Sequence, residues 1–194
     1  MAPTLAPPKT PRGLHHSAYV TRDAQACADF YSDTLRMPLV ATVINNEVAQ
    51  TREPYPYLHL FFRMWDGSTL AFFESPGLPE PARASDPAYD VFNHLALDVG
   101  SREEVDRWAA YLAARGVATV GPKDHGIIYS LYLHDPDGHR VELTANCDTH
   151  WQMGGDAAED DLRRWSQAKA AAAGDAAVLR DWIEANRKYP GQPH

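Results

Sequence analysis

The chain contains a weak internal repeat, and this repeat limits the possible folds more than any other feature. The segments Leu14–Val20 and Phe92–Val99 are short, rich in β-forming residues, and carry a histidine at the same place, His16 and His94. In each copy a helix-capping residue follows seven positions later, and a helical pattern begins there. A chain built in this way must place two similar modules in one fold.

Each copy continues in the same order of predicted elements. The two helices are predicted over Ala24–Leu35 and Glu103–Arg115. The strands that follow them are predicted over Leu39–Ile44, Tyr57–Met64, Thr69–Glu74, Ala118–Val120, Ile128–His134 and Arg140–Thr144. An Asp-Gly turn joins the last two strands of each copy, and a Pro-rich linker, Ser75–Tyr89, joins the copies. The sequence therefore predicts an α+β fold of two βαβββ modules, which must bury their sheet faces together because each is too small to carry a core alone.

The last part of the chain has a different composition, rich in alanine and charged residues. Helical periodicity covers Asp156–Ala173 and Asp175–Lys188, with a break at Gly174. We expect these helices to cover the outside of the domain or a partner copy, and a helical lid over a pocket is the alternative. The predicted organisation is a flexible Pro-rich arm over residues 1–12, a central domain over 13–147 with modules of about 13–75 and 90–147, and a C-terminal helical extension over 148–194.

Composition excludes several classes of protein. Hydrophobic residues make up 44% of the 194 residues and the formal net charge is −8, so a wholly disordered chain and a general binder of nucleic acid or acidic membranes are both disfavoured. No apolar run is long enough to span a membrane, and the first residues lack the apolar core of a signal peptide. Cys27 and Cys147 form no CxxC pair, which favours two packing thiols and a reducing, cytoplasmic location. The nucleotide-binding glycine signatures and the GxSxG elbow are also absent.

Three residues at corresponding landmarks of the repeat form a candidate metal site. His16 and His94 lie near the start of the first strand of each module, and Glu142 lies in the last strand of the second module. Two imidazoles and one carboxylate are a facial ligand set that leaves positions open for substrate or O₂. His15 competes with His16, but strand alternation puts the two on opposite faces, and the repeat aligns His16 with His94.

The first module has no carboxylate at the place of Glu142. Four residues after Gly138 comes Glu142, whereas four residues after Gly67 comes Ala71, which cannot bind a metal. Glu74 lies three positions further on, an odd offset that predicts the other face of the strand. Three protein ligands suit a metal that its substrate chelates.

Three further residues could handle protons or hold a substrate. His59 alternates with apolar residues in a strand, and His125 lies in a loop before a strand. A histidine titrates near neutral pH and can move a proton, although a structural role is the alternative for both. Tyr132 precedes Glu142 by ten residues across a predicted hairpin, where its hydroxyl could donate to a developing oxyanion.

These motifs together resemble the vicinal oxygen chelate superfamily of glyoxalase I, bleomycin- and fosfomycin-resistance proteins and type I extradiol dioxygenases. The resemblance covers roughly His15 to Asn146 and is carried by the segments His15–Asp23, Phe30–Met37, Asn93–Ala96 and Asp135–Leu143. It implies paired βαβββ modules that form a half-open mixed β-barrel around a metal. The chain looks most like the small one-domain extradiol dioxygenases, on the segments Pro56–His59, Leu70–Glu74, Gly121–Gly126 and Tyr132.

In those dioxygenases two histidines and a glutamate hold Fe(II), which matches His16, His94 and Glu142. A loop histidine and a tyrosine contact the substrate oxygens, which matches His125 and Tyr132. Larger relatives carry a catalytic histidine within a His-His-Ser-Leu-Ala-Phe segment, where this chain reads Gly-Ser-Thr-Leu-Ala-Phe. That histidine is absent, and His59 on the adjoining strand is the expected replacement.

The sequence therefore predicts a non-haem Fe(II) dioxygenase that cleaves a catecholic ring with O₂, with Mn(II) or another divalent ion as the alternative metal. Phe61, Phe73 and Tyr129 are expected to shape the pocket. Two alternatives stay open: another metal-dependent reaction of the superfamily, such as isomerisation, epimerisation or lyase chemistry, and a resistance protein that only binds a small molecule. The expected partners are a small aromatic or other chelating substrate and O₂, with no nucleic acid or membrane. A hydrophobic sheet edge and the Trp-bearing C-terminal helices favour a homodimer.

Overall fold

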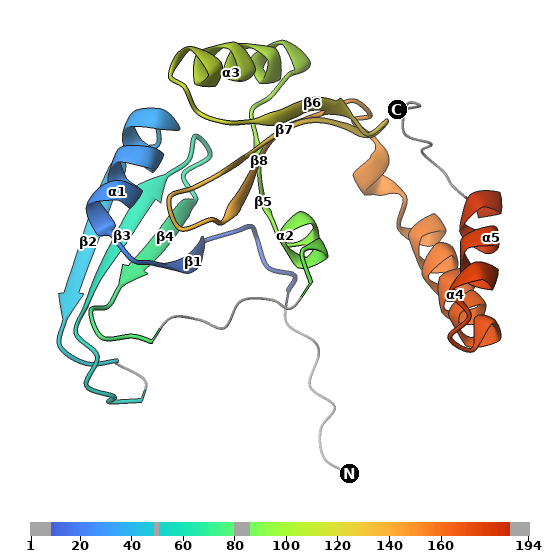
Figure 1. The fold of residues 1–194 in the computed structure, drawn as a ribbon, viewed down its shortest axis with the longest axis horizontal. Helices are drawn as coiled ribbons and strands as arrows, with labels where there is room; N and C mark the ends of the chain where they lie inside the picture. The colour runs from blue at the N-terminus through green and yellow to red at the C-terminus, as the bar shows by residue number, and fades with distance from the viewer. Residues whose placement is uncertain (1–8, 49–50, 80–85, 187–194) are drawn as a thin grey trace. The chain divides into compact units, whose positions relative to one another are not determined.

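A computed structural model describes residues 9–48, 51–79 and 86–186 of the chain (Figure 1). The chain divides into two compact units. The first unit is Met1–Ser85 with Asp135–Gly138, and the second is Asp86–His134 with His139–His194. Each unit contains one four-stranded mixed sheet, which confirms the predicted α+β class and the duplicated module.

The sheet of the first unit has the strand order β1-β4-β3-β2. Its strands are β1 (His16–Thr21), β2 (Leu39–Asn45), β3 (Tyr57–Arg63) and β4 (Thr69–Glu74). β1 pairs in parallel with β4, and the other pairs are antiparallel. Helix α1 (Ala24–Ala28) provides the crossover from β1, and the side chain of Asp23 caps it by accepting from the amides of Gln25 and Ala26.

The sheet of the second unit repeats this topology with the order β5-β8-β7-β6. Its strands are β5 (Leu95–Asp98), β6 (Val120–Asp124), β7 (Ile128–His134) and β8 (Arg140–Asn146). β5 again pairs in parallel with β8, and helix α3 (Arg102–Ala114) provides the crossover. Ser101 caps α3 through the amide of Glu104, as its position three residues before a glutamate predicts.

The two sheets correspond residue by residue. In the first unit Ala71 lies opposite Ala18 on one side and Phe61 on the other. In the second unit Glu142 holds the same place, between Ala96 and Tyr132. The predicted equivalence of Ala71 and Glu142 is therefore confirmed by strand register.

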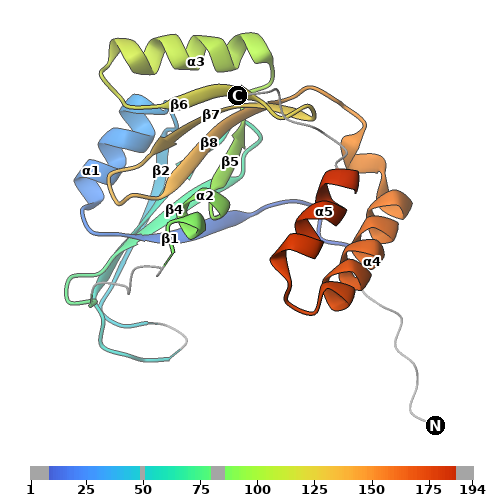
Figure 2. The same cartoon turned by 45° about the vertical axis from the view of Figure 1, so that its right-hand side comes forward.

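Each sheet has one apolar face that forms a core. In the first unit Tyr31, Phe62 and Phe72 form an aromatic core, with ring centroids 4.7–6.1 Å apart. In the second unit α3 lies along the sheet (Figure 2), and its Val105 and Leu112 are fully buried. Four strand residues complete that second core: Leu131, Leu133, Val141 and Leu143. Each Å² of apolar surface removed from water contributes about 25 cal/mol to the free energy of folding, so these faces are the main source of stability.

The structure corrects three predicted elements. The helix expected over Ala24–Leu35 continues beyond α1 as a π-helical segment, Asp29–Thr34, in which Tyr31 is buried and donates its hydroxyl to Asp135 at 2.9 Å. The strand expected over Ala118–Val120 instead spans β6, because an edge strand tolerates a glycine and a proline at a register shift. A short helix, α2 (Ala88–Phe92), ends the predicted linker and leaves His94 one residue before β5.

The C-terminal extension is helical as predicted, with α4 (Gly155–Ala172) and α5 (Ala176–Asn186). The two helices contact one another, and the rings of Trp165 and Trp182 lie 5.9 Å apart.

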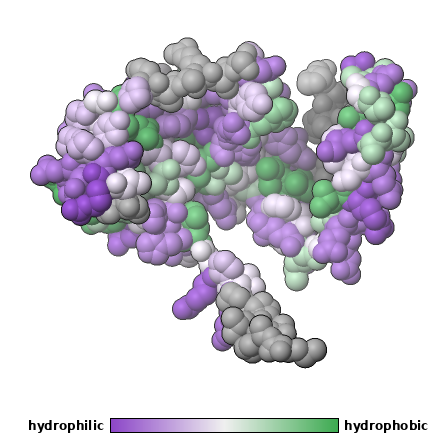
Figure 3. Space-filling view, turned by 90° about the horizontal axis from the view of Figure 1, so that it is seen from below, coloured by the Kyte–Doolittle hydropathy of each residue, from purple (hydrophilic) through white to green (hydrophobic). Residues whose placement is uncertain are grey.

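The surface seen in Figure 3 is mainly hydrophilic with scattered hydrophobic groups. Among the described helices, none is both long and apolar enough to cross a membrane. Most of the predicted Pro-rich arm, residues 80–85 of the linker and the end of the last predicted helix lie outside the described residues.

Candidate metal centre

The sheet of the second unit has one apolar and one polar face. Successive residues of a strand point to opposite faces of the sheet. Leu131 and Leu143 therefore point toward α3, and their neighbours along each strand point to the other face. The polar face carries Ser130, Tyr132, His134, Arg140, Glu142 and Thr144 from the paired strands β7 and β8. Four of the six predicted site residues gather at or beside this face: His94, His125, Tyr132 and Glu142.

Glu142 is the buried acid of this face. Only 1% of its surface is exposed, and a carboxylate at that depth needs several partners. Its Oε2 lies 2.8 Å from Nε2 of His94, and its Oε1 accepts the hydroxyl of Tyr132 at 3.2 Å. Within the described part of the chain, no lysine or arginine forms an ion pair with this carboxylate.

His94 faces an acceptor on both of its ring nitrogens. Its Nδ1 lies 3.3 Å from the carbonyl oxygen of Val91, and its Nε2 faces Glu142. A neutral imidazole has a single N–H, so it can satisfy only one of these two contacts. A cation between Nε2 and the carboxylate, either a second proton or a metal ion, would satisfy the other. Neighbouring ligand atoms of one metal at about 2.0–2.2 Å lie roughly 3 Å apart, so the 2.8 Å separation fits a shared metal.

Tyr132 connects Glu142 to a histidine at the edge of the sheet. Because its hydroxyl proton goes to Glu142, the 2.9 Å contact with Nε2 of His125 requires that histidine to donate. Burial raises the pKa of Tyr132, and the negative charge of Glu142 raises it further. The hydroxyl therefore stays protonated and remains a donor at neutral pH. The predicted cross-strand proximity of Tyr132 and Glu142 is confirmed.

The remaining two predicted residues lie together on the sheet of the first unit. His16 begins β1, and its Nδ1 lies 2.7 Å from Nδ1 of His15. His15 thus engages one nitrogen of His16 and leaves Nε2 for another partner. The ring centroid of His59 on β3 lies 6.5 Å from that of His16.

His59 is buried in an aromatic setting. Its ring stacks on Phe73 with centroids 3.5 Å apart, and Phe61 lies 4.1 Å away. Its Nε2 is buried and has no hydrogen-bond partner among the described residues. Burial lowers the pKa of His59, and the nearby His16 lowers it further, so the ring is neutral at pH 7.

The prediction for the pocket aromatics is partly wrong. Phe61 and Phe73 share the face of His59, but Tyr129 lies on the opposite face of its sheet, with Ala145 as its cross-strand partner. There Tyr129 donates to Asp106 of α3 at 2.9 Å. Strand parity explains the error, because Tyr129 is an odd number of residues from Tyr132.

Sequence reasoning did not single out Arg140. It lies two residues before Glu142 on the same face of β8, and its guanidinium lies 4.4 Å from the ring centroid of Tyr132. Its sequence position indicates this placement, because a residue two positions before Glu142 in a strand lies on the same face.

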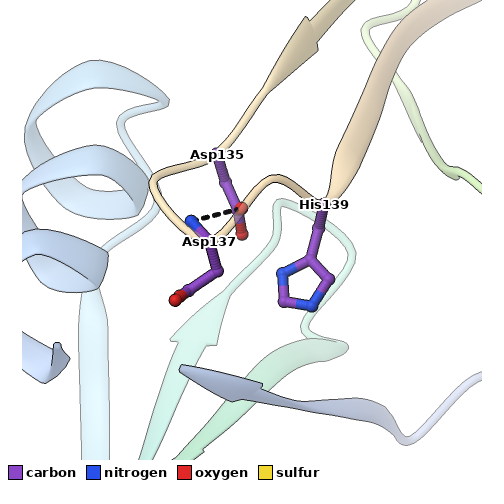
Figure 4. A group of neighbouring side chains, drawn as sticks. All are labelled: Asp135, Asp137 and His139. Atoms are coloured by element: carbon purple, nitrogen blue, oxygen red, sulfur yellow. Dashed lines mark hydrogen bonds between the residues drawn. The ribbon is translucent and has the colours of Figure 1, made fainter. Parts of the chain in front are cut away.

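A second group of possible ligands occurs in the turn after β7. Oxygen and nitrogen atoms of Asp135, Asp137 and His139 lie within 4.8 Å of one another (Figure 4). Both carboxylates already serve the turn, however. Asp135 accepts from the amide of Asp137 at 3.0 Å and from Tyr31, and Asp137 accepts from Arg22 at 3.1 Å. These bonds explain the Asp-Pro-Asp-Gly motif as a fixed turn.

Comparison with known proteins decides the family. The family model of the Glyoxalase/Bleomycin resistance protein/Dioxygenase superfamily matches residues 13–143. The chain belongs to this superfamily. The match covers both βαβββ modules and ends one residue after Glu142, so it contains every predicted site residue.

Two curated proteins are similar in sequence. The chain is 30% identical over 137 residues to "Putative ring-cleaving dioxygenase MhqA" of Bacillus subtilis (strain 168), which is 69% of this chain and 40% of that protein. It is 27% identical over 134 residues to 2,2',3-trihydroxybiphenyl dioxygenase of Sphingomonas paucimobilis, which is 68% of this chain and 40% of that protein. The matched part of the chain therefore spans about two fifths of the length of these relatives.

Solved structures of the superfamily show the same fold. A glyoxylase/bleomycin resistance protein/dioxygenase domain from Frankia sp. EAN1pec aligns with a TM-score of 0.56 at 18% identity, over 73% of this chain and 96% of that one. A glyoxalase/dioxygenase from Nostoc punctiforme aligns with a TM-score of 0.51 at 22% identity, over 75% and 100%. At these identities the likeness concerns the fold.

Proposed function

We propose that this protein is a metal-dependent extradiol-type dioxygenase that cleaves a catecholic ring with O₂. The proposed ligands are His16, His94 and Glu142, with Fe(II) as the metal. The proposal requires the two modules to bring His16 to the His94–Glu142 pair. The names of the two curated relatives support the reaction class, and the residues of the second unit support the metal.

One observation carries the proposal: the 2.8 Å contact between His94 and the buried carboxylate of Glu142. Both ring nitrogens of His94 face acceptors, and a metal on Nε2 with Nδ1–H donating to Val91 would satisfy both contacts at once. Imidazole and carboxylate are the protein ligands of non-haem Fe(II) sites with open positions. His15 and the Val91 carbonyl each engage the Nδ1 of their histidine, which is how protein partners orient metal-binding imidazoles.

Bound Fe(II) would supply a Lewis-acidic centre that both catechol oxygens and O₂ can reach. Tyr132 would turn its hydroxyl from Glu142 to one substrate oxygen when a metal takes up the carboxylate, and the hydroxyl stays protonated because its pKa is raised. His125 donates to Tyr132 from the exposed side and would restore a proton that the tyrosine passes on. Both atoms of O₂ end in the ring-opened product, so the reaction needs no external reductant.

His59 would handle the proton of the catechol. Its buried Nε2 lacks a partner among the described residues, and its neutral ring can accept a proton from a phenol. Phe61 and Phe73 hold the ring in place and give an apolar surface for an aromatic substrate. His59→Gln is expected to lower kcat by about 10²–10⁴-fold and leave the bound metal unchanged. Wild-type kcat in that variant would remove His59 from the mechanism.

The test of the function is elemental analysis of anaerobically purified protein, followed by oxygen-electrode assays with a panel of catechols. The expected result is one iron per chain, one O₂ consumed per catechol, and a yellow ring-opened product. Bound metal without oxygen uptake would contradict the dioxygenase and favour another metal-dependent reaction. Tight binding of a small molecule by metal-free protein, with no product, would favour a binding protein.

A further inference from the structure

Arg140 is a cation without an anionic partner beside the candidate metal centre. Its side chain is half-buried, and its Nε is fully buried with no hydrogen-bond partner in the described part of the chain. It forms no ion pair with any described residue, and Glu142, two positions along the same strand face, bonds to His94 and Tyr132 instead. The guanidinium lies 4.4 Å from the ring centroid of Tyr132.

Burying part of an arginine side chain costs free energy unless an acceptor binds its N–H groups. Burying the Nε–H of Arg140 without an acceptor loses its hydration, and a stacking contact with the face of Tyr132 supplies no acceptor for it. The neighbouring side chain across the hairpin, His134, forms no hydrogen bond with Arg140 in the described part of the chain, and its Nε2 faces Asp90 at 3.2 Å. The polar face thus presents the buried Nε–H of Arg140 without an acceptor, next to the residue that would hold the substrate oxygen.

We propose that Arg140 binds a carboxylate on the substrate, so that the substrate class is a catechol that carries a carboxylate substituent. This inference rests on the proposed function, because Tyr132 is the common contact of the substrate oxygen and of Arg140. A planar guanidinium matches a carboxylate through two parallel hydrogen bonds, and such pairs are among the strongest in proteins. The pair would orient the ring relative to Tyr132 and reject neutral catechols.

The test compares acids with their methyl esters, which differ in charge while keeping the ring. The probes are 2,3-dihydroxybenzoate and 3,4-dihydroxyphenylacetate, each with its ester, titrated anaerobically into the iron-loaded protein. We expect the wild type to bind at least one acid about 10–100-fold more tightly than its ester. Arg140→Gln should remove that preference and leave the ester affinity within about twofold, and Arg140→Lys should keep part of it. Equal affinity of acid and ester in the wild type for both pairs, or a preference that survives in Arg140→Gln, would overturn the inference.

Lys123 offers a matched control. It lies opposite Ser130 and therefore on the same sheet face, and it is exposed, with no ion pair to any described residue. Lys123→Gln removes one positive charge and is expected to keep the preference for the acid. An equal loss in Lys123→Gln and Arg140→Gln would mean that net charge sets the preference, which contradicts a specific pair.

Adding O₂ to the same samples tests the proposed function separately from the role of Arg140. Ring cleavage of acid and ester at equal kcat/KM would overturn the role of Arg140 and leave the dioxygenase intact. Selective binding of the acid without oxygen uptake would support Arg140 and contradict the dioxygenase.

Discussion

The two modules of this protein share one scaffold but differ in the chemistry of one sheet face. Strands β3 and β7 have the same sequence of buried and half-buried positions, and their partners β4 and β8 have the same register. At the central cross-strand pair the second module has Tyr132 and Glu142, whereas the first has Phe61 and Ala71. The fold therefore tolerates either an apolar or an ionisable pair at this place.

Under the proposed function, this difference gives the two modules different roles. The second module holds the carboxylate, a histidine and the hydrogen-bonded tyrosine, which suit metal binding and substrate polarisation. The first module holds His16 and an aromatic surface around His59, which suits contact with a ring. Core residues keep both sheets alike, and the open face is where a duplicated module can diverge without loss of packing.

The largest expected effect comes from removing the carboxylate that distinguishes the second module. Glu142→Gln keeps the size and the bond to Tyr132 but loses the negative charge, so we expect affinity for Fe(II) or Co(II) to fall by more than about 100-fold. Isothermal titration and the visible spectrum of the Co(II) protein would measure this. Unchanged Co(II) binding would show that the metal lies elsewhere.

The next effect comes from exchanging the aromatic partners. Tyr132→Phe makes the second module like the first and should lower kcat by about 10–100-fold, because one hydrogen bond to the substrate oxygen is lost. Metal content should stay unchanged. Phe61→Tyr is the reciprocal control and should leave kcat within about threefold. If both variants lose kcat equally, the two positions contribute through packing and not through the hydroxyl.

The reverse transplant tests whether the first module can accept a carboxylate. Ala71 is fully buried, so Ala71→Glu should lower the free energy of unfolding by about 2–4 kcal/mol. Phe61→Tyr in the same chain should restore about 0.5–1.5 kcal/mol through a cross-strand hydrogen bond. Urea unfolding at pH 7 measures both values. A fully stable Ala71→Glu protein would show that His16 or a bound metal already compensates this position.

The smallest effect concerns the two thiols, one in each unit. Burial raises the pKa of Cys27 to about 12, so its thiolate is scarce at pH 8–9.5, and raising pH within this window should not expose it. Half-buried Cys147 should react first with a disulfide reagent. We expect one fast thiol, which Cys147→Ala removes, and a second that reacts only on unfolding. Two fast thiols in the native protein would contradict the burial of Cys27.

The raised pKa of Cys27 also makes the stability of the first unit fall at alkaline pH. Because the pKa of Cys27 is higher in the folded chain than its ordinary value of 9.0, this contribution to stability is fully present below pH 9. It is lost progressively as pH rises from 9 toward about 12, as the unfolded chain ionises first.

The repeated strand order and the equivalence of Ala71 and Glu142 were predictable from the sequence alone. Both follow from local signals: Asp-Gly turns, capping residues and strand alternation, which act over a few residues. Counting from each glycine turn was enough to place the Tyr132–Glu142 pair across one hairpin. The same alternation places Tyr129 on the opposite face, because it lies an odd number of residues from Tyr132.

Which side chains have hydrogen-bond partners depends on the three-dimensional fold. Neighbours from other strands or loops set the surroundings of three side chains. They place an acceptor at both ring nitrogens of His94, and they leave Nε of Arg140 and Nε2 of His59 without a partner among the described residues. The buried hydroxyl of Tyr31 likewise donates to Asp135, about a hundred residues away in sequence. Hydrogen bonding and desolvation are set by atoms a few ångströms apart in space, and a linear pattern does not record those distances.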